Sequence, residues 1–219
     1  MNQRIIRPIC AFSIVLILAT AAQTAGAVGY PDANIILLEP DDRGPAIETA
    51  AFFPDGSRLL TAETDRSHEK WAIRVRDETN GHELFHLTDR AGYASGMVTC
   101  AVCSPDGALI VGGFEGSGTE SPSRTIRVWT SSSGEEVSQP VDACDWITSL
   151  CFSTDGSFLI STDLRRFVRI WEVDSWKEIG AVPASPDTKS EVQAVVASEG
   201  NRIITASIDG AVRIWEFES

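Results

Sequence analysis

An internal repeat constrains the fold of this sequence more than any other feature. A phrase of eleven residues, built around a turn acid and a glycine, recurs at intervals of 44 to 51 residues. It reads FFPDGSRLLTA, CSPDGALIVGG, FSTDGSFLIST and, with less similarity, ASEGNRIITAS, and its turn acids are Asp55, Asp106, Asp155 and Glu199. Each acid precedes a glycine, which accepts the positive φ that a tight hairpin needs. The repeat therefore predicts a fold assembled from four similar units.

Other strand-like runs surround each turn phrase. They are short, rich in Val, Ile, Leu and Phe, and bounded by Gly, Pro, Asp and Ser, without a helical period. The runs before the turn begin at Ala46, Met97, Trp146 and Glu191, those after it begin at Ala72, Thr125, Phe167 and Ala211, and a fourth set spans His82–Leu87, Glu135–Val141 and Lys177–Val182. Units of four antiparallel strands are typical of propeller blades. The predicted fold class is an all-β propeller with four-stranded antiparallel blades.

The phrase S-P-D-G, followed by a strand and then V-R-I-W, resembles the WD-repeat β-propeller family over nearly all of residues 28–219. The resemblance implies a scaffold function and a repeat core that contains Trp129, Trp171, Trp215 and the turn acid Asp209. No unit has the pair W-D, and Arg76 stands at the tryptophan position of the first unit. The family's Gly-His is missing ahead of the first strand of each unit, where the histidine positions hold Arg43, Ala94, Ala143 and Asp187. We therefore expect blades that lack most of the family's buried His–Asp network.

The last unit contains three predicted strands, and a further strand-like run, Ala33–Pro40, precedes the first unit. In the family an N-terminal strand completes the last blade, and the resemblance implies this role for Ala33–Pro40. Four blades are few, since rings of seven or eight need roughly 280 to 360 residues. Three arrangements stay open. They are a closed four-bladed ring, a homodimer that completes an eight-bladed ring, and an open half-ring that needs a partner or is a degenerate fragment of a larger propeller.

Residues 1–27 have the features of a cleaved secretory signal peptide. Arg4 and Arg7 precede the apolar stretch Ile9–Ala22, and Ala25–Ala27 supplies the small-x-small pattern of a cleavage site. A bilayer-spanning helix needs about 20 apolar residues, which this stretch lacks. We expect one propeller-like domain at residues 28–219 in a periplasmic or secreted protein, with an uncleaved anchor as the alternative.

The cysteines and histidines predict neither a metal nor a cofactor. Cys100 and Cys103 form a C-x-x-C inside a predicted strand, where alternation sends them to opposite faces. Burial in the core is the favoured interpretation, with a Cys100–Cys151 or Cys144–Cys151 disulfide as the alternative. His82 and His86 would share one face of a strand while Glu83 points the other way, and no third ligand is evident.

A net charge of −13 argues against nucleic acid or an anionic membrane surface as a partner. Among the innermost predicted strands only Glu48 and Glu191 are acidic, and no catalytic motif occurs in the sequence. We therefore expect a non-catalytic scaffold without a cofactor. The alternative is a propeller enzyme or small-ligand binder whose central mouth brings Glu48, Glu191 and His68 together.

Candidate binding residues follow from their positions in the repeat. In such blades, the loop into the first strand and the loop between the second and third strands open on one rim. That rim would carry His68, Glu69, Tyr93, Asp145, Trp146, Arg165 and Arg166. An aromatic side chain flanked by charges is typical of an interaction hot spot, although Trp146 could instead pack between blades. The predicted partner is another protein.

Overall fold

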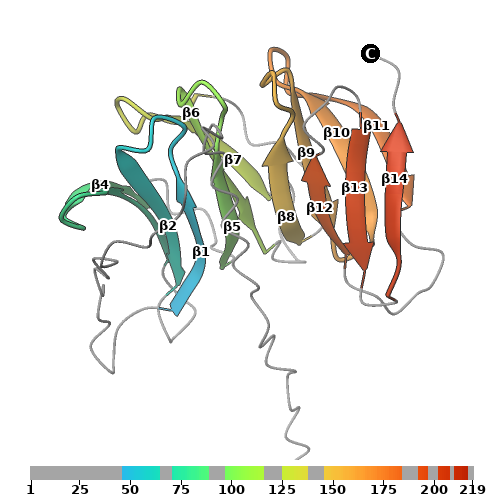
Figure 1. Cartoon of the computed structure of the whole chain (residues 1–219), viewed down its shortest axis with the longest axis horizontal. Helices are drawn as coiled ribbons and strands as arrows, with labels where there is room; N and C mark the ends of the chain where they lie inside the picture. The colour runs from blue at the N-terminus through green and yellow to red at the C-terminus, as the bar shows by residue number, and fades with distance from the viewer. Residues whose placement is uncertain are drawn as a thin grey trace, which may run out of the picture.

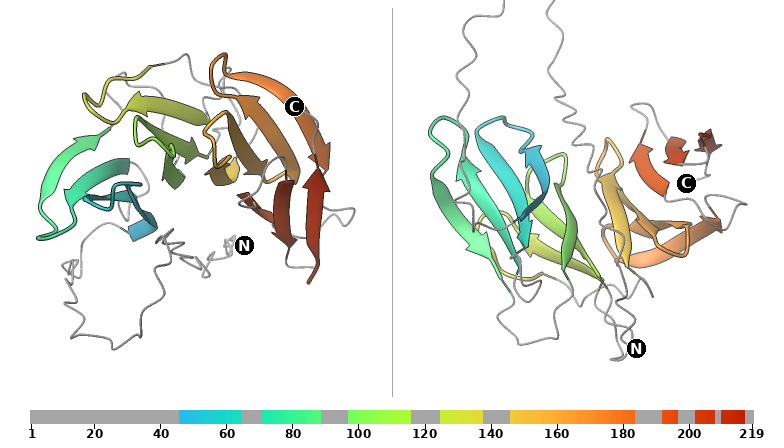
Figure 2. Two further views of the ribbon diagram at one scale, coloured as in Figure 1. Left: turned by 45° about the horizontal axis from the view of Figure 1, so that its top comes forward. Right: turned by 90° about the horizontal axis from the view of Figure 1, so that it is seen from below.

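The computed structural model describes residues 46–64, 71–88, 97–115, 125–137, 146–183, 192–196, 202–207 and 210–216. Within these residues the chain forms fourteen strands and no helix. The strands make four antiparallel sheets that stand side by side along an open arc (Figures 1 and 2). The predicted all-β class and the predicted blades are confirmed.

The four sheets follow the four sequence repeats, and we call them blades 1 to 4. Blade 1 contains β1 (Ala46–Phe52), β2 (Arg58–Thr64), β3 (Trp71–Asp77) and β4 (Glu83–Leu87); blade 2 contains β5 (Val98–Cys103), β6 (Leu109–Phe114) and β7 (Ile126–Thr130); blade 3 contains β8 (Ile147–Phe152), β9 (Phe158–Asp163), β10 (Phe167–Glu172) and β11 (Lys177–Pro183); blade 4 contains β12 (Val192–Val196), β13 (Arg202–Ser207) and β14 (Val212–Glu216). In each blade, strands that are consecutive in the sequence pair with one another.

The predicted fourth strands have three different outcomes. Those of blades 1 and 3 are present as β4 and β11. In blade 2, the described part of the run Glu135–Val141 makes only an isolated bridge between Glu136 and Trp129. The run Ala33–Pro40, predicted to complete blade 4, lies outside the described residues.

The Asp-Gly phrase forms the turn between the first two strands of a blade. In blade 3, Asp155 Oδ1 accepts a hydrogen bond of 3.0 Å from the Ser157 amide, and Gly156 has a φ of 76°. These bonds to Ser153 and Ser157 hold the pKa of the Asp155 carboxyl below its ordinary value. Asp55 and Asp106 accept the equivalent amide bonds in blades 1 and 2. The turn is therefore stabilised by bonds within a few residues of itself.

The core lies between consecutive blades. We call the face of a blade that packs on the next blade its forward face, and the opposite face its rear face. Ile73 and Val75 on the forward face of blade 1 belong to one buried cluster with Ile110 and Trp129 of blade 2. Blades 2 and 3 share a second cluster, and blades 3 and 4 share a third. Each interior face is therefore buried by its neighbour in the arc.

Candidate protein-binding surfaces

The predicted rim is described at its third blade. Trp146 directly precedes β8, and its carbonyl accepts a hydrogen bond of 3.0 Å from the amide of Leu164, in the turn between β9 and β10. The Trp146 side chain is 37% exposed, and Leu164 and Arg165 are also exposed. The structure thus brings together three predicted rim residues, Trp146, Arg165 and Arg166, and adds Leu164. His68, Glu69, Tyr93 and Asp145 lie outside the described residues.

Asp163 holds the β9–β10 turn in a defined shape. Its buried carboxylate accepts bonds from the Phe167 amide at 2.9 Å and from Arg169 Nε at 3.2 Å, and its carbonyl accepts the Arg166 amide at 2.8 Å. Arg166 has a φ of 66°, which is uncommon for a residue with a side chain. The rim turn is therefore fixed by a buried acid, which the sequence reasoning did not single out.

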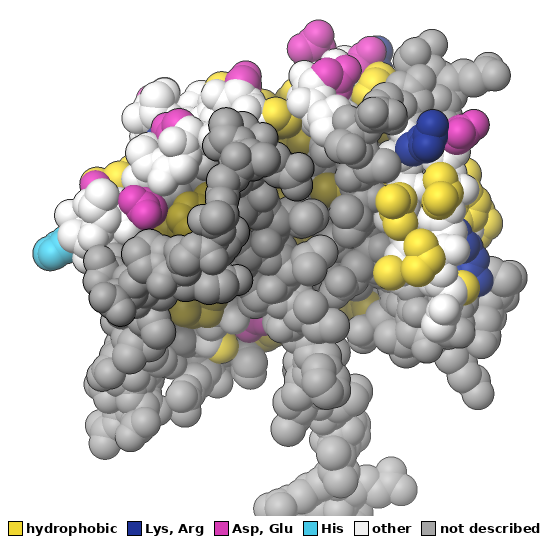
Figure 3. All heavy atoms as spheres, in the orientation of Figure 1, with side chains coloured by type: hydrophobic (Ala, Val, Ile, Leu, Met, Phe, Trp, Pro, Cys, Tyr) yellow, Lys and Arg dark blue, Asp and Glu magenta, His cyan; other side chains and the backbone are white. Residues whose placement is uncertain are grey.

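A second candidate surface lies at the end of the arc, on the forward face of blade 4. Val212 is 67% exposed and Ile214 65% exposed, and Figure 3 shows apolar side chains gathered over β13 and β14. The equivalent residues of earlier blades are all buried: Ile73, Val75, Ile126, Val128, Val168 and Ile170. This face is therefore an apolar blade surface without a described neighbour.

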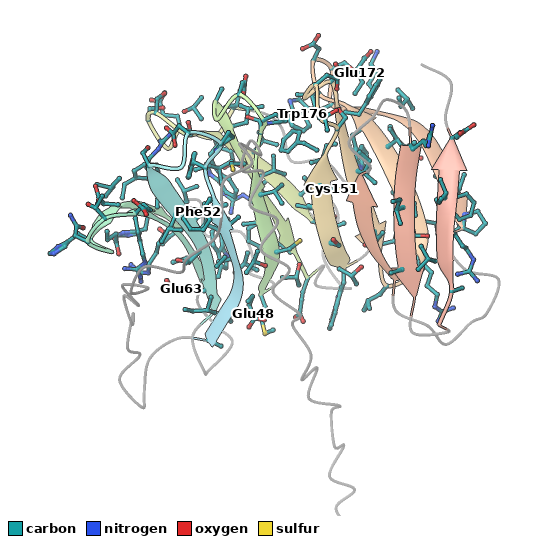
Figure 4. All side chains as sticks on the ribbon, in the orientation of Figure 1. Glu48, Phe52, Glu63, Cys151, Glu172 and Trp176 are labelled. Carbon is teal, nitrogen blue, oxygen red and sulfur yellow. The ribbon has the colours of Figure 1, made fainter. Side chains whose placement is uncertain are left out.

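The opposite end of the arc differs in chemistry. Arg76 occupies the tryptophan position on the rear face of blade 1, and its guanidinium bonds Glu63 at 3.0 Å. Arg74 Nε bonds the same carboxylate at 2.7 Å, and Thr61 donates a further bond. Burial would raise the pKa of Glu63, but the bonds from Arg76, Arg74 and Thr61 outweigh it and lower that pKa. Blade 1 thus carries an ion cluster where later blades carry an indole, and Figure 4 marks Glu63 near one end of the blade.

The tryptophans occupy the rear faces of the later blades. Trp129 and Trp171 are buried and Trp215 is half-buried. Trp171 Nε1 donates to Ser161 Oγ at 2.9 Å, and Trp215 Nε1 donates to Thr205 Oγ1 at 3.0 Å. Trp129 instead packs in an aromatic cluster with Trp71 and Phe114. Asp209, the fourth predicted core residue, lies outside the described residues.

One side-chain direction was predicted wrongly. Glu83 Oε1 lies 2.6 Å from His86 Nδ1, so Glu83 does not point away from the histidine. The reason is a register shift in the β3–β4 pair, which leaves Leu84 as an extra residue and breaks the strict alternation of β4. His82 lies before β4 begins.

The described cysteines occupy the core, as the favoured interpretation predicted. Cys100 and Cys103 are free thiols on opposite faces of blade 2, so the Cys100–Cys151 disulfide is not formed in this structure. Burial raises the pKa of Cys100 to about 12 and that of Cys103 to about 11. Cys144 lies outside the described residues, and Cys151 lies on β8 (Figure 4).

Of the residues nominated for a central mouth, Glu48 is half-buried in β1, while Glu191 and His68 lie outside the described residues. Among the described residues, no three His, Cys, Asp or Glu side chains gather as a metal site would require. The described ranges also contain no helix with the length and hydrophobicity of a membrane span.

Comparison with known proteins agrees with the blades. Residues 137–172, which include β8 to β10, and residues 182–216, which include β12 to β14, match the family model described as WD domain, G-beta repeat. With four such sheets in sequence order, the chain is a WD-repeat protein built of propeller blades.

Similar proteins include transducin beta-like protein 3 of Bos taurus, which is 24% identical over 94% of this chain and 25% of its own length. Small ribosomal subunit protein RACK1y of Oryza sativa subsp. japonica is 25% identical over 74% of this chain and 45% of its own length. Telomerase protein component 1 of Rattus norvegicus is 29% identical over 72% of this chain and 6% of its own length. The chain thus spans less than half the length of each of these relatives.

Proposed function

We propose that this chain is a non-catalytic scaffold that binds another protein through the rim formed by Trp146 and the β9–β10 turn. The exposed Trp146 indole beside exposed Leu164 and Arg165 carries the proposal. Trp and Arg are enriched among residues that dominate binding energy at protein interfaces. WD-repeat proteins generally bind other proteins, which supports the same role here.

The rim can be tested by capture from an extract of the source organism on the immobilised full chain. A protein held by the wild type should be lost from Trp146→Ala and weakened by Arg165→Glu. Leu84→Ala removes another exposed apolar side chain, on β4, and should keep that protein. Equal retention by the Trp146 and Leu84 variants would show that the rim is not the binding surface.

We also propose that residues 1–27 act as a cleaved export signal, so that the working protein is periplasmic or secreted. The two arginines, the apolar stretch and the small-x-small pattern support this proposal. The intact mass of the protein purified from its own cells should correspond to a chain that starts at Val28. A mass that includes Met1 would contradict cleavage.

A second candidate is self-assembly, in which two chains complete one larger ring. The exposed Val212 and Ile214 favour it, because the same positions in other blades are covered by a following blade. The Arg76–Glu63 cluster at the other end is less suited to cover them, because docking would bury further charge. Light scattering behind a sizing column should give a mass near two chains if this assembly forms, and near one chain otherwise.

A further inference from the structure

The outer edge of β14 is the starting point. Among the described residues no strand pairs with this edge, whereas β3 and β10 pair there with β4 and β11. An open strand edge offers backbone N–H and C=O groups to an added strand, which is a known way of binding an extended peptide. The other blades indicate what sequence such a strand should have.

A glutamate recurs at one register position of the outer strand. It stands opposite the residue at the tryptophan position in blades 1 to 3, in the pairs Arg76–Glu83, Trp129–Glu136 and Trp171–Glu178. In each blade its carboxylate bonds the arginine two residues before that position: Arg74, Arg127 and Arg169. Each blade with a described partner for its third strand therefore has the same Arg–Glu bond.

Blade 4 repeats the receiving half of this pattern. Arg213 and Trp215 occupy the positions of Arg169 and Trp171, and β13 pairs with β14 in the register in which β9 pairs with β10. A strand added in the register of β4 would place its glutamate opposite Trp215, within reach of Arg213. Charge-assisted bonds of this kind are about twice as strong as neutral ones.

The apolar residues of β14 define a second requirement. In blade 1, Phe85 follows Glu83 by two residues, stands opposite Val75 and packs against the buried cluster. Ile214 holds the position of Val75 and is exposed. An apolar residue two positions after the incoming glutamate would cover Ile214.

We propose that the outer edge of β14 binds an extended acidic segment of a partner protein, with a Glu-x-apolar sequence whose carboxylate bonds Arg213 and whose apolar side chain covers Ile214. This proposal rests on the proposed scaffold function and names a site and a ligand chemistry for it. Charge complementarity with Arg213 and the pattern of three other blades argue for this occupant.

The test uses the full chain and a labelled peptide that copies residues 81–88, GHELFHLT, from β4. Fluorescence anisotropy should show saturable binding of one peptide per chain. A peptide with Glu83→Gln should bind about tenfold more weakly, because a charge-assisted bond becomes a neutral one. Equal affinity of the two peptides, or no saturable binding, would overturn the proposal. Because this change is made in the peptide, misfolding of a protein variant cannot hide the result.

Protein variants locate the site. Arg213→Gln should weaken the Glu83 peptide about tenfold and leave the Gln peptide unchanged, since the lost bond involves both groups. Arg165→Gln, on the rim, is the matched control and should change neither affinity. An Arg213 variant that still distinguishes the two peptides would overturn this assignment.

Two further outcomes identify a different occupant and overturn the proposal. One is peptide binding only after deletion of residues 28–45, which would mean that this chain's own segment fills the edge. The other is peptide binding only on dilution of a dimer, which would mean that a second copy fills it. Trp146→Ala should leave peptide binding unchanged, so failure of the β14 site and failure of the rim are distinguishable.

Discussion

Arg76 shows how one residue changes the character of a blade. Its position holds tryptophan in the other three repeats, where the indole packs on the preceding blade. In blade 1 the guanidinium and Arg74 surround Glu63, whose side chain is almost completely buried. A buried carboxylate is stable only when it is paired, so Glu63 and these two arginines depend on one another.

Glu63→Gln should destabilise the chain by roughly 2 kcal/mol at neutral pH, because two arginines lose a charged partner. The folded pKa of Glu63 lies below its ordinary value of 4.5. Its ionised form therefore stabilises the fold above the unfolded pKa, and this contribution disappears as pH falls through the folded pKa. Urea unfolding of both proteins between pH 7 and pH 3 should show the difference shrinking in acid. A difference that is constant over this range would contradict the assignment.

The two core thiols should be unreactive in the folded chain. Burial raises the pKa values of Cys100 and Cys103 to about 12 and about 11, so almost no thiolate is present at neutral pH. Mass mapping after iodoacetamide treatment should find both residues unmodified in buffer and modified in denaturant. Rapid modification of Cys100 in buffer would show that the blade 2–blade 3 contact opens readily.

At the scale of the strand, close packing between blades depends on missing side chains. A Cβ at Gly113 in β6 would lie 2.7 Å from Cys100 Sγ and 2.7 Å from a methyl carbon of Ile147 in the next blade. Gly113 therefore permits the approach of β8 to blade 2 at a distance that a larger residue would increase.

Gly113→Ala should cost about 1 to 3 kcal/mol in urea unfolding, because the added methyl group overpacks a filled interface. Gly180→Ala is the matched control, since its Cβ would come no closer than 4.0 Å to Ile170 and its backbone is an ordinary strand. That variant should change stability by less than about 0.5 kcal/mol. Similar costs for the two variants would mean that the blade spacing adjusts.

At the scale of the whole molecule, the arc has two unlike ends. Blade 1 presents an ion cluster beside the exposed Ile47 and Phe52, whereas blade 4 presents Val212 and Ile214. Repeat proteins need terminal units with a polar outer face, and blade 1 meets this requirement in part. Blade 4 keeps the apolar face of an interior unit, which is why we place a binding surface there.

Ile170→Ala and Ile214→Ala remove equivalent side chains from blades 3 and 4. The first should cost roughly 2 to 5 kcal/mol, because Ile170 is buried against blade 4. The second should cost less than about 1 kcal/mol, since Ile214 is exposed and only its strand preference is lost. Urea unfolding of the full chain measures both, and equal costs would show that Ile214 is covered in solution.

Much of the fold could be predicted because its signals are local. Asp155 and Gly156 form their turn with bonds to the nearest residues, and the strands follow as short apolar runs. The direction of Glu83 was missed because a bulge depends on the pairing of two strands. The role of Asp163 was missed because its partners become neighbours only when the hairpin closes. Of the predicted rim, the contact between Trp146 and the β9–β10 turn is described.

The phrases FVRIWE and AVRIWE separate what is local from what is not. Both form the third strand of a blade, with the same pairing to the second, because alternation and flanking turns are contained in the sequence itself. Yet Val168 and Ile170 are buried, while Val212 and Ile214 are exposed. Burial depends on whether another blade covers the forward face, and that neighbour is no part of the phrase. The chain's sequence thus determines its blades, and the tertiary structure alone decides which of their faces are core and which are available for binding.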